Sequence, residues 1–507
     1  MEASNLQIYW HESQPIYSLC FQPDPSNKPK LITGGGDNKV RVWHLNFEET
    51  HKTKIETIDF LSSLNQHEQA INAVRFNHKG DTLASAGDDG QLLLWKQSDQ
   101  RQTQFGESDT AFEESWTVTK RFRSSSSRIG AFEIYDIAWS PNDDYIVTGS
   151  MDNAIRVFEI SSGECIATAS DHTHYVQGVV WDPLDKYIFS QSADRSVHVY
   201  EVIRNPSENE IVELKIKNKI MKSELPVCKR ESKDFDLQST KLCFLFHNET
   251  LPSFFRRPAM SPCGSILCVP AGIFRTDSSA EGATSPDVNN AVQIYTRSSM
   301  IKNINKPVMC IPFLKKPAIV VSFNPNLYKL TNDSNSYLQL PYKLVFAVAT
   351  SNEVIIYDTE SIEPIALIGN LHYTTLTDLC WSKDGALLMI SSTDGFCSYI
   401  SIAPGTLGEK LTHEETAKAI GVKRKQYNKD SSSEPAPCAE ASPSPSHPKQ
   451  ADIVNILPVK RKLGEKEKEM EERKTHKPSP EDERVAGSEN SPQQLSKEKR
   501  AEFNQPL

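Results

Sequence analysis

The sequence lacks the features that mark membrane-spanning, secreted and metal-binding proteins. It has no run of about 18 apolar residues, and its first ten residues, MEASNLQIYW, contain no basic segment followed by an apolar one. Its ten cysteines include no CxxC pair, and the nearest approach to a metal pair, Cys263 with Cys268, has no His or Cys partner at ligand spacing. We therefore expect a protein that is soluble and not secreted, with reduced thiols and with no metal or cofactor.

Signs of catalysis and of nucleic-acid binding are also missing. No glycine-rich phosphate loop and no nucleophile–base arrangement stands out, so no catalytic residue is predicted. The net charge of −10 over 507 residues argues against a general nucleic-acid surface and against direct sequence-specific recognition of DNA or RNA. An acidic body instead favours encounter with a basic protein partner.

What the sequence does contain is a repeated pattern of strand and turn residues. The unit from His172 to Tyr200 holds short alternating apolar runs separated by Asp, Pro and Ser, which is typical of strands with one buried face joined by tight turns. Such a meander cannot bury its faces alone and needs copies of itself. Seven units are readable within residues 1–404, four of them strongly.

The copies share a fixed spacing of polar and aromatic residues. In the four strong units an Asp lies six residues before a strand-closing aromatic, and a Ser or Thr lies ten residues before it. Three of these units also have a His upstream, and the last of the seven units offers His372 and Asp394. The strong units contain His11, Thr33, Asp37 and Trp43; His67, Ser85, Asp89 and Trp95; Thr148, Asp152 and Phe158; and His172, Ser190, Asp194 and Tyr200.

This pattern resembles the WD40 repeat, which implies an all-β fold, a seven-bladed β-propeller over residues 1–404 with about four strands per blade. In that family the His, Ser or Thr, Asp and Trp of a blade form a hydrogen-bonded tetrad, so we assign these residues to the architecture and not to catalysis. The third unit has SSSSRIGAF where the His is expected, which predicts an incomplete tetrad. A strand at Leu6–Trp10 is expected to complete the last blade and close the ring.

After residue 404 the composition changes. Residues 405–507 have only Tyr427 and Phe503 as aromatics, many prolines and nearly balanced charge, so we predict a disordered tail. Two basic clusters in it predict nuclear import, with solvating charge as the alternative, and Ser-Pro pairs at positions 442, 444, 479 and 491 are candidate phosphorylation sites. The clusters are Lys423, Arg424 and Lys425, and Lys460, Arg461 and Lys462 followed by Leu463.

Within the predicted propeller, the best candidate for a partner-binding site is the run Phe254, Phe255, Arg256 and Arg257. Aromatic and Arg side chains are frequent in interface hot spots. Two interpretations stay open, namely partner contact, or core packing of the two Phe beside a solvated or structural Arg pair. If the first holds, replacing Arg256 and Arg257 with Glu weakens assembly while the propeller stays folded. The Lys-rich stretch KIKNKIMK at 215–222 is a solvated strand or loop, or a further partner patch.

Four longer stretches narrow the assignment. The segments YVQGVVWDPL, SFFRRPAMSPCGSILCVPAG, LPYKLVFAVAT with VIIYDT, and LHYTTLTDLCWSKDG with ISSTDGFCS are similar, in this order, to the WD-repeat subunit of chromatin assembly factor 1. The resemblance implies a nuclear, non-catalytic scaffold of a three-subunit histone chaperone that deposits new histones H3 and H4 on replicating DNA. It implies as partners the large subunit, the small WD-repeat histone-binding subunit, and histones H3 and H4, contacted directly or through the complex.

The resemblance also implies a tail motif that docks on the anti-silencing-function histone chaperone, for which Lys460–Leu463 in ILPVKRKLGE is the candidate. Two alternative functions stay open. One is the propeller of a replication-independent, Hir-type histone chaperone, which has similar repeats. The other is a substrate receptor of a ubiquitin ligase, against which the blade endings Trp43-His44 and Trp95-Lys96 count, since such receptors often show Trp-Asp-x-Arg.

Overall fold

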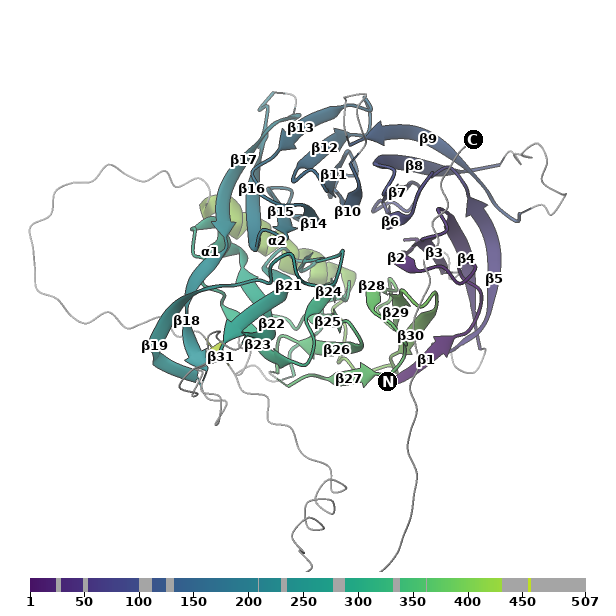
Figure 1. Ribbon diagram of the computed structural model, residues 1–507. Coiled ribbons are helices and arrows are strands. Elements are labelled where there is room, and N and C mark those ends of the chain that lie inside the picture. Colours follow the sequence, from purple (N-terminus) through teal and green to yellow (C-terminus); the bar gives the residue numbers. More distant parts are fainter. Residues whose placement is uncertain are drawn as a thin grey trace, which may run out of the picture. The chain divides into compact units, whose positions relative to one another are not determined.

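The chain forms a ring of seven antiparallel sheets arranged as the blades of a β-propeller, which confirms the predicted fold class (Figure 1). Within the unit Met1–Val459, the sheets follow one another in sequence order around the ring. The computed structural model describes residues 1–23, 29–48, 53–99, 112–124, 132–207, 209–228, 235–276, 288–331, 338–361, 363–430 and 455–456.

Each blade runs from an innermost to an outermost strand. The first four blades are β2 (Ile16–Phe21), β3 (Lys30–Gly35), β4 (Val40–Phe47) and β5 (Ile55–Leu64); β6 (Ile71–Phe76), β7 (Leu83–Gly87), β8 (Gln91–Ser98) and β9 (Ser115–Arg123); β10 (Ile134–Trp139), β11 (Tyr145–Ser150), β12 (Ile155–Glu159) and β13 (Cys165–Ala169); and β14 (Val176–Trp181), β15 (Tyr187–Ser192), β16 (Ser196–Arg204) and β17 (Ile211–Ile220). The last three are β20 (Ala259–Met260), β21 (Ile266–Arg275), β22 (Val288–Thr296) and β23 (Met309–Leu314); β24 (Ala318–Phe323), β25 (Val345–Thr350), β26 (Glu353–Asp358) and β27 (Ala366–Gly369); and β28 (Leu376–Trp381), β29 (Leu387–Ser392), β30 (Cys397–Ser401) and β1 (Glu2–Leu6).

Burial explains why the inner strands read as continuous apolar runs and the outer strands do not. In blade four every residue of β15 is buried, because neighbouring blades cover both of its faces. The outermost strand β17 has exposed and buried residues along IVELKIKNKI, since its outer side meets water. Most of the Lys-rich stretch 215–222 therefore belongs to an edge strand of the ring.

The ring is closed by the N-terminal strand. β1 pairs antiparallel with β30 over the whole register from Glu2 opposite Ser401 to Leu6 opposite Cys397, so the first residues complete the seventh blade. The expected closure is present, but the strand lies at residues 2–6 and not at 6–10. Trp10 is fully buried and its ring packs against Trp43 at a centroid distance of 4.8 Å, which holds the turn between closure and the first blade.

Six of the innermost strands contain an irregularity at the same place. The register with the second strand shifts by one residue at the second position of β2, β6, β10, β14, β24 and β28. A β-bulge leaves its extra residue out of the ladder and turns its carbonyl and side chain in a new direction. The bulged residues are Tyr17, Asn72, Tyr135, Gln177, Ile319 and Thr377.

Two additions were not expected from the sequence. A two-stranded hairpin, β18 (Lys222–Cys228) and β19 (Phe235–Phe244), follows blade four, and a short helix α1 (Arg297–Ile301) follows β22. The two-residue strand β31 (Asn455–Ile456) pairs parallel with the outer strand β23, in register Met309 with Asn455. No helix within the described ranges is both long and apolar enough to cross a membrane.

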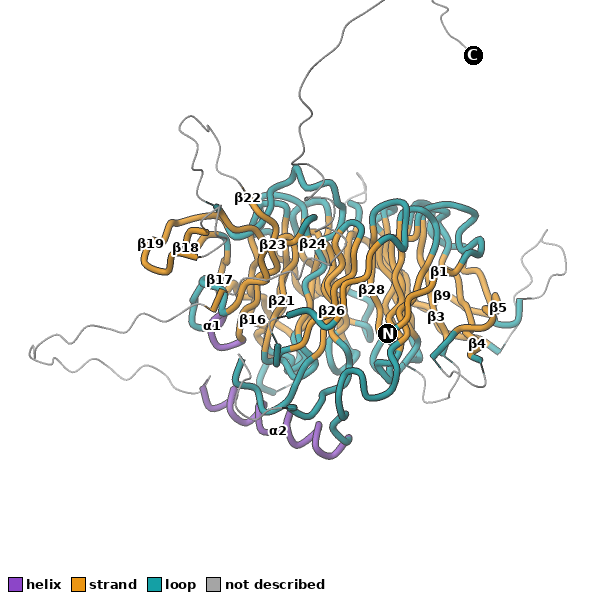
Figure 2. Tube along the Cα trace, turned by 90° about the horizontal axis from the view of Figure 1, so that it is seen from below, coloured by secondary structure: helices purple, strands orange, loops and turns teal. Residues whose placement is uncertain are grey.

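The chain beyond residue 404 differs in part from the expected disordered tail. Leu407 is buried among the strands of blades six and seven, and helix α2 (His413–Asp430) follows. Leu411, Ala419 and Ile420 pack against Leu327 and other residues of blades five and six, so α2 lies against one face of the ring (Figure 2). Apart from β31, the rest of the predicted tail lies outside the described residues.

Candidate functional site

The tetrad of blade one is a chain of buried polar contacts. His11 Nδ1 lies 2.6 Å from Asp37 Oδ1, His11 Nε2 lies 2.7 Å from Thr33 Oγ1, and Trp43 Nε1 donates to the same hydroxyl at 2.9 Å. Burial lowers the pKa of His11, although Asp37 opposes the effect. A neutral ring that donates to Asp37 and accepts from Thr33 satisfies every group in the chain.

Three further blades contain the same connection between the loop before the innermost strand and the turn after the second strand. In blade seven the hydroxyl comes from Ser398 on β30, which lies 2.7 Å from His372 Nε2, while Asp394 lies 3.1 Å from Nδ1. The other distances are 2.8 Å for His67–Asp89, 2.7 Å for His67–Ser85, 2.8 Å for His172–Asp194, 2.7 Å for His172–Ser190 and 2.8 Å for Trp95–Ser85.

Blade three shows what happens when the His is missing. The buried Thr148 hydroxyl has no hydrogen-bond partner among the described residues. Asp152 instead forms an ion pair with Arg156 and accepts a hydrogen bond from Ser150 at 2.6 Å, so its turn is held from within the blade. The structure therefore brings Thr148 and Asp152 into the same blade but not into one network.

We expect Thr→Val substitutions to separate the two kinds of blade. Thr33→Val removes a hydroxyl that serves both His11 and Trp43, and should lower the free energy of unfolding by about 1–3 kcal/mol. Thr148→Val removes a hydroxyl without a described partner and should cost less than about 0.5 kcal/mol. Urea unfolding of both variants measures this difference, and equal losses would contradict it.

The tetrad of blade four contains a second His that the sequence analysis did not single out. His198 on β16 stacks on His172 with ring centroids 3.6 Å apart, and burial lowers the pKa of His198 to about 3, with His172 contributing. Ligand atoms of His172, Asp194 and His198 lie within 4.8 Å of one another. Both nitrogens of His172 already contact Asp194 and Ser190, so this cluster is occupied by its own hydrogen bonds and offers no open coordination site.

This stack predicts a pH dependence of stability. A folded pKa of about 3 for His198 lies below the value of about 6.5 in the unfolded chain, so its contribution is present at neutral pH and is lost as pH falls from 6.5 towards 3. The slope from this group is at most about 1.4 kcal/mol per pH unit. His198→Phe keeps the stack and should make urea-unfolding free energies fall less steeply from pH 6 to pH 4. His413→Gln, on the exposed start of α2, is the control, and unchanged slopes for His198→Phe would contradict the assignment.

The predicted partner-binding run proves to be mostly interior. Phe254 is 65% exposed, but Phe255, Arg256 and Arg257 are buried. The second of the two interpretations therefore applies to these three residues, and the Arg pair is structural. Only Phe254 keeps the exposure that a partner contact requires.

The two Arg residues belong to a central segment, Ser253–Pro258, that contacts the bulged residues of five blades. Arg257 donates from its guanidinium to the carbonyl oxygens of Tyr17 at 3.2 Å, Thr377 at 3.0 Å and Asn72 at 2.6 Å. The backbone N–H of Arg257 donates to Ile319 O at 2.9 Å, and that of Arg256 donates to Gln177 O at 3.3 Å. Carbonyl groups left out of the ladder by the bulges thus find their partners in this one segment.

The charge of Arg257 is balanced by two buried carboxylates. It lies 3.2 Å from Asp378 and 3.5 Å from Asp136, and Arg75 lies 2.9 Å from Asp378. Burial raises the pKa of Asp136 against the opposing effect of Arg257, whereas for Asp378 the two Arg residues outweigh burial and lower the pKa. Gly178 allows the segment to approach, because a Cβ there would lie 2.0 Å from Arg256 O.

Sequence reasoning missed these two carboxylates and a second buried pair. Arg297, at the start of α1, donates through both terminal nitrogens to Asp182 in the turn after β14, at 2.5 and 2.6 Å, and so ties blade five to blade four. A signal was available for Asp136 and Asp378, since each is the third residue of an otherwise buried innermost strand. A carboxylate at such a position requires a buried cation.

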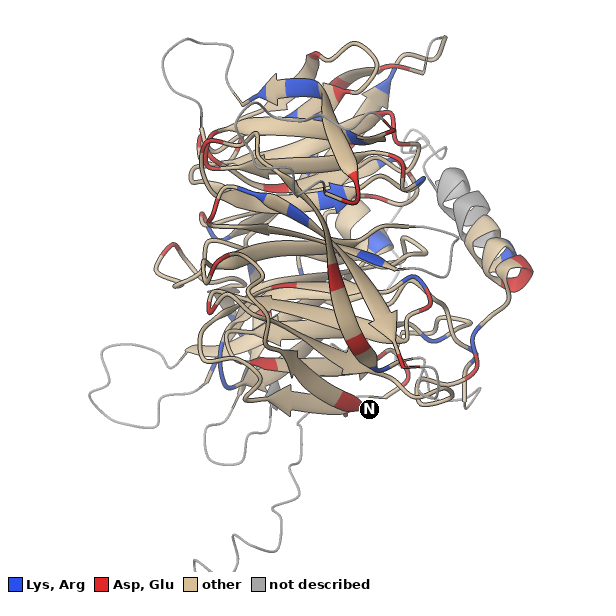
Figure 3. Ribbon diagram, turned by 90° about the vertical axis from the view of Figure 1, so that its right-hand side faces the viewer, with Lys and Arg blue, Asp and Glu red and all other residues tan. Residues whose placement is uncertain are grey.

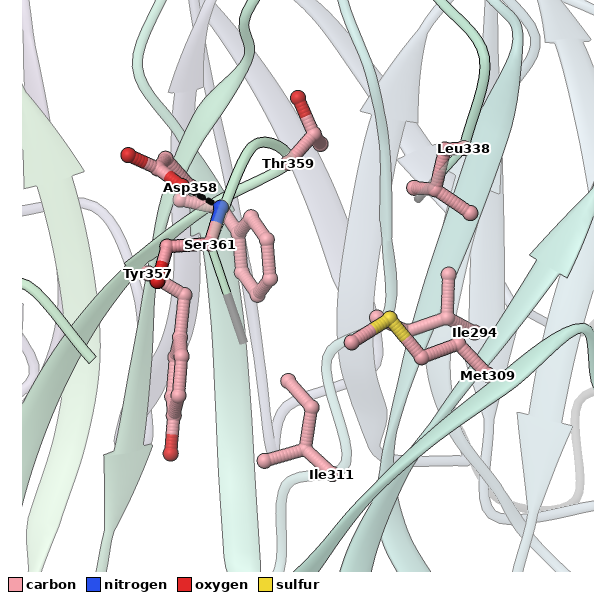
Figure 4. A pocket seen from close by; sticks show the side chains of 9 residues that line it. Ile294, Met309, Ile311, Leu338, Tyr357, Asp358, Thr359 and Ser361 are labelled. Carbon is pink, nitrogen blue, oxygen red and sulfur yellow. Dashed lines mark hydrogen bonds between the residues drawn. The ribbon is translucent and has the colours of Figure 1, made fainter. Parts of the chain in front are cut away.

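One apolar pocket lies between blades five and six (Figure 4). Met309 and Ile311 of β23 face Phe346 and Tyr357 across it, and its carboxylate, Asp358, accepts a hydrogen bond from the backbone N–H of Ser361 at 2.7 Å. The pocket thus combines hydrophobic walls with an acid that is capped by its own turn, which gives it no catalytic constellation. The other lining residues are Ile294, Leu338 and Thr359.

The charged side chains follow the rims of the ring. Acidic residues lie largely in the turns at both rims, while the sheet faces between them are mostly uncharged (Figure 3). Lys423, Arg424 and Lys425 lie in helix α2 and not in an extended tail, and Lys460–Leu463 lie outside the described residues. The described chemistry is that of a rigid surface suited to binding.

Comparison with known proteins agrees with this fold and narrows it. The family described as the CAF1B/HIR1 beta-propeller domain matches residues 1–407. The chain is 48% identical to the CAF1B subunit of chromatin assembly factor 1 from Saccharomyces cerevisiae, over 91% of this chain and 96% of that protein. It is 39% identical to the protein of the same name from Schizosaccharomyces pombe, over 82% and 90%.

More distant relatives carry the name of the second branch. Protein HIR1 of Yarrowia lipolytica is 24% identical over 80% of this chain and 38% of its own length. The higher identity and the near-complete coverage both favour the first branch. The chain therefore belongs to the CAF1B family of chromatin assembly factor 1 subunits.

Proposed function

We propose that this protein is a non-catalytic scaffold subunit of a chromatin assembly factor 1 complex, which deposits newly made histones H3 and H4 on replicating DNA. The observation that carries the proposal is the 48% identity to a CAF1B subunit of chromatin assembly factor 1 over almost the full length of both chains. The closed ring supports a binding role, since its buried polar groups serve tetrads and blade contacts.

The proposed partners are the large subunit, the small WD-repeat histone-binding subunit, and histones H3 and H4, reached directly or through the complex. We propose a nuclear location, with the basic clusters at 423–425 and 460–462 as import signals, and docking of the anti-silencing-function histone chaperone at Lys460–Leu463. An acidic propeller is suited to a basic partner such as histones.

Affinity purification of the full chain from nuclei, followed by mass spectrometry, tests the proposal. We expect a Lys/Glu-rich large subunit, a second WD-repeat protein and core histones to be recovered together in similar amounts. Recovery of a cullin adaptor in their place would overturn the proposal in favour of a ubiquitin-ligase receptor.

A Hir-type function is the second candidate, because the matching family covers both branches and HIR1 proteins are among the relatives. The two functions differ in their dependence on DNA synthesis. A Hir-type chaperone would deposit histones equally on replicating and non-replicating DNA, whereas the proposed function requires replication.

A further inference from the structure

The rim at which the innermost strands begin, here named the tetrad rim, has a floor at its centre. The central segment Ser253–Pro258 joins the inner strands of the blades there through Arg257. Helix α2 packs against Leu327, which lies beyond the other end of β24 and so on the opposite rim. Among the described residues the tetrad rim therefore has no helix lying across it.

Aromatic side chains from four blades gather around this floor. Tyr17 lies 5.9 Å from Phe255 and Phe254 lies 6.5 Å from it, measured between ring centroids. Tyr135 and Tyr175 form a second pair at 5.8 Å. Tyr17 and Tyr135 are bulged residues, which is why their rings reach the rim. Phe254 is the most exposed of the set.

Two carboxylates complete the surface between the aromatic rings. Tyr135 donates its hydroxyl to Glu133 at 2.7 Å, and Asp88 accepts from Asn72 at 2.6 Å. Burial raises the pKa of Asp88, and the like charge of Glu133 adds to the effect. Unlike Asp136 and Asp378, neither carboxylate forms an ion pair within the described part of the chain.

We propose that this surface, named the aromatic–acidic mouth, binds an extended segment of a partner protein in which Arg or Lys alternates with apolar residues. The mouth consists of Tyr17, Asp88, Glu133, Tyr135, Tyr175 and Phe254. A cation between Asp88 and Glu133 would relieve their repulsion and lie beside the faces of Tyr17 and Tyr135. An apolar side chain of the segment would cover Phe254.

The closed floor sets the geometry of binding. Because the guanidinium of Arg257 and the ring of Phe255 fill the centre, the segment lies across the rim and does not thread the ring. The inference goes beyond the proposed function, since it names a site and a recognition chemistry that hold for any complex in which the chain acts.

A labelled peptide of about ten residues, with Arg and Leu alternating in a Gly-Ser background, is the probe, and its fluorescence anisotropy with the full chain is measured at about 50 mM salt. Two matched peptides replace Arg by Glu or Leu by Ser. The site variants are the double variant Asp88→Asn, Glu133→Gln, which keeps the hydrogen-bond acceptors, and Phe254→Ser. The controls are Glu213→Gln with Glu224→Gln, which makes the same charge change on β17 and β18, and Leu367→Ser on β27.

We expect the Arg–Leu peptide to bind, and each site variant to weaken binding at least about tenfold, while both controls leave it within about twofold. The Glu peptide should not bind and the Ser peptide should bind more weakly. Equal losses in site variants and controls would show attraction to net charge only and would overturn the inference, as would no binding of the Arg–Leu peptide. Circular-dichroism melting of each variant confirms that it is folded, and either result leaves the co-purification test of the proposed function independent.

Discussion

Replacing Arg257 with Met is expected to lower the free energy of unfolding by about 3–5 kcal/mol, among the largest effects of any single change in this chain. The substitution leaves Asp136 and part of Asp378 without their buried cation, and it leaves three bulge carbonyls without a donor. Met fills a similar volume, so the loss reports the polar contacts and not a cavity.

Urea unfolding followed by tryptophan fluorescence measures the effect. Phe254→Ala is the matched control, since Phe254 lies in the same segment but is exposed, and it should change the free energy of unfolding by less than about 0.5 kcal/mol. Similar small losses for both variants would contradict the role given to Arg257. For the same reason, replacing Arg256 and Arg257 with Glu should unfold the propeller, so that change cannot report partner binding in a folded protein.

Deleting residues 2–10 is expected to cost at least about 4 kcal/mol and to make the protein aggregate as its concentration rises. The deletion removes β1, whose five residues pair with β30, and it removes the buried Trp10. β30 then becomes an exposed edge strand in an open ring, which is a template for pairing between molecules.

Light scattering and urea unfolding test this expectation, and a synthetic peptide of residues 1–12 added in trans should restore monodisperse protein. Removal of residues 460–507, a separate unit outside the described ranges, serves as the control and should leave the unfolding midpoint unchanged. A deletion variant that stays monomeric and keeps the full stability would show that ring closure by β1 is dispensable.

The tetrads could be predicted because their members lie close in sequence and at fixed spacing. His67, Ser85 and Asp89 fall within one repeat, and turn chemistry together with strand alternation places them without knowledge of the other blades. The missing His of blade three was visible in the same way, and the hydroxyl of Thr148 lacks a described partner in accordance with it.

The central segment could not be predicted in the same way, because its contacts join distant parts of the chain. Arg257 bonds to Tyr17 across 240 residues and to Thr377 across 120, and no local pattern records these partners. An Arg beside two Phe reads equally as an interface or as an interior group until the bulged strands are in place. The buried Asp136 and Asp378 were the signals that could have decided between the two.

The C-terminal part shows a different reason for a missed element. Composition after residue 404 is typical of disorder, yet Leu407 and Leu411 are apolar anchors that fix the start of the segment on the ring. α2 then extends from that anchor with few apolar contacts of its own, such as Ala419 and Ile420. Average composition hides a few residues whose tertiary contacts decide the local structure.

Histone deposition on DNA replicated in an extract depleted of this protein tests the central claim most directly, that a closed and non-catalytic ring acts in chromatin assembly by binding. Added full-length protein should restore deposition of histones H3 and H4 on replicated DNA, and the variant that lacks residues 2–10, whose ring is open, should not. Deposition that persists after depletion, or that is restored equally on DNA that has not replicated, would contradict the account.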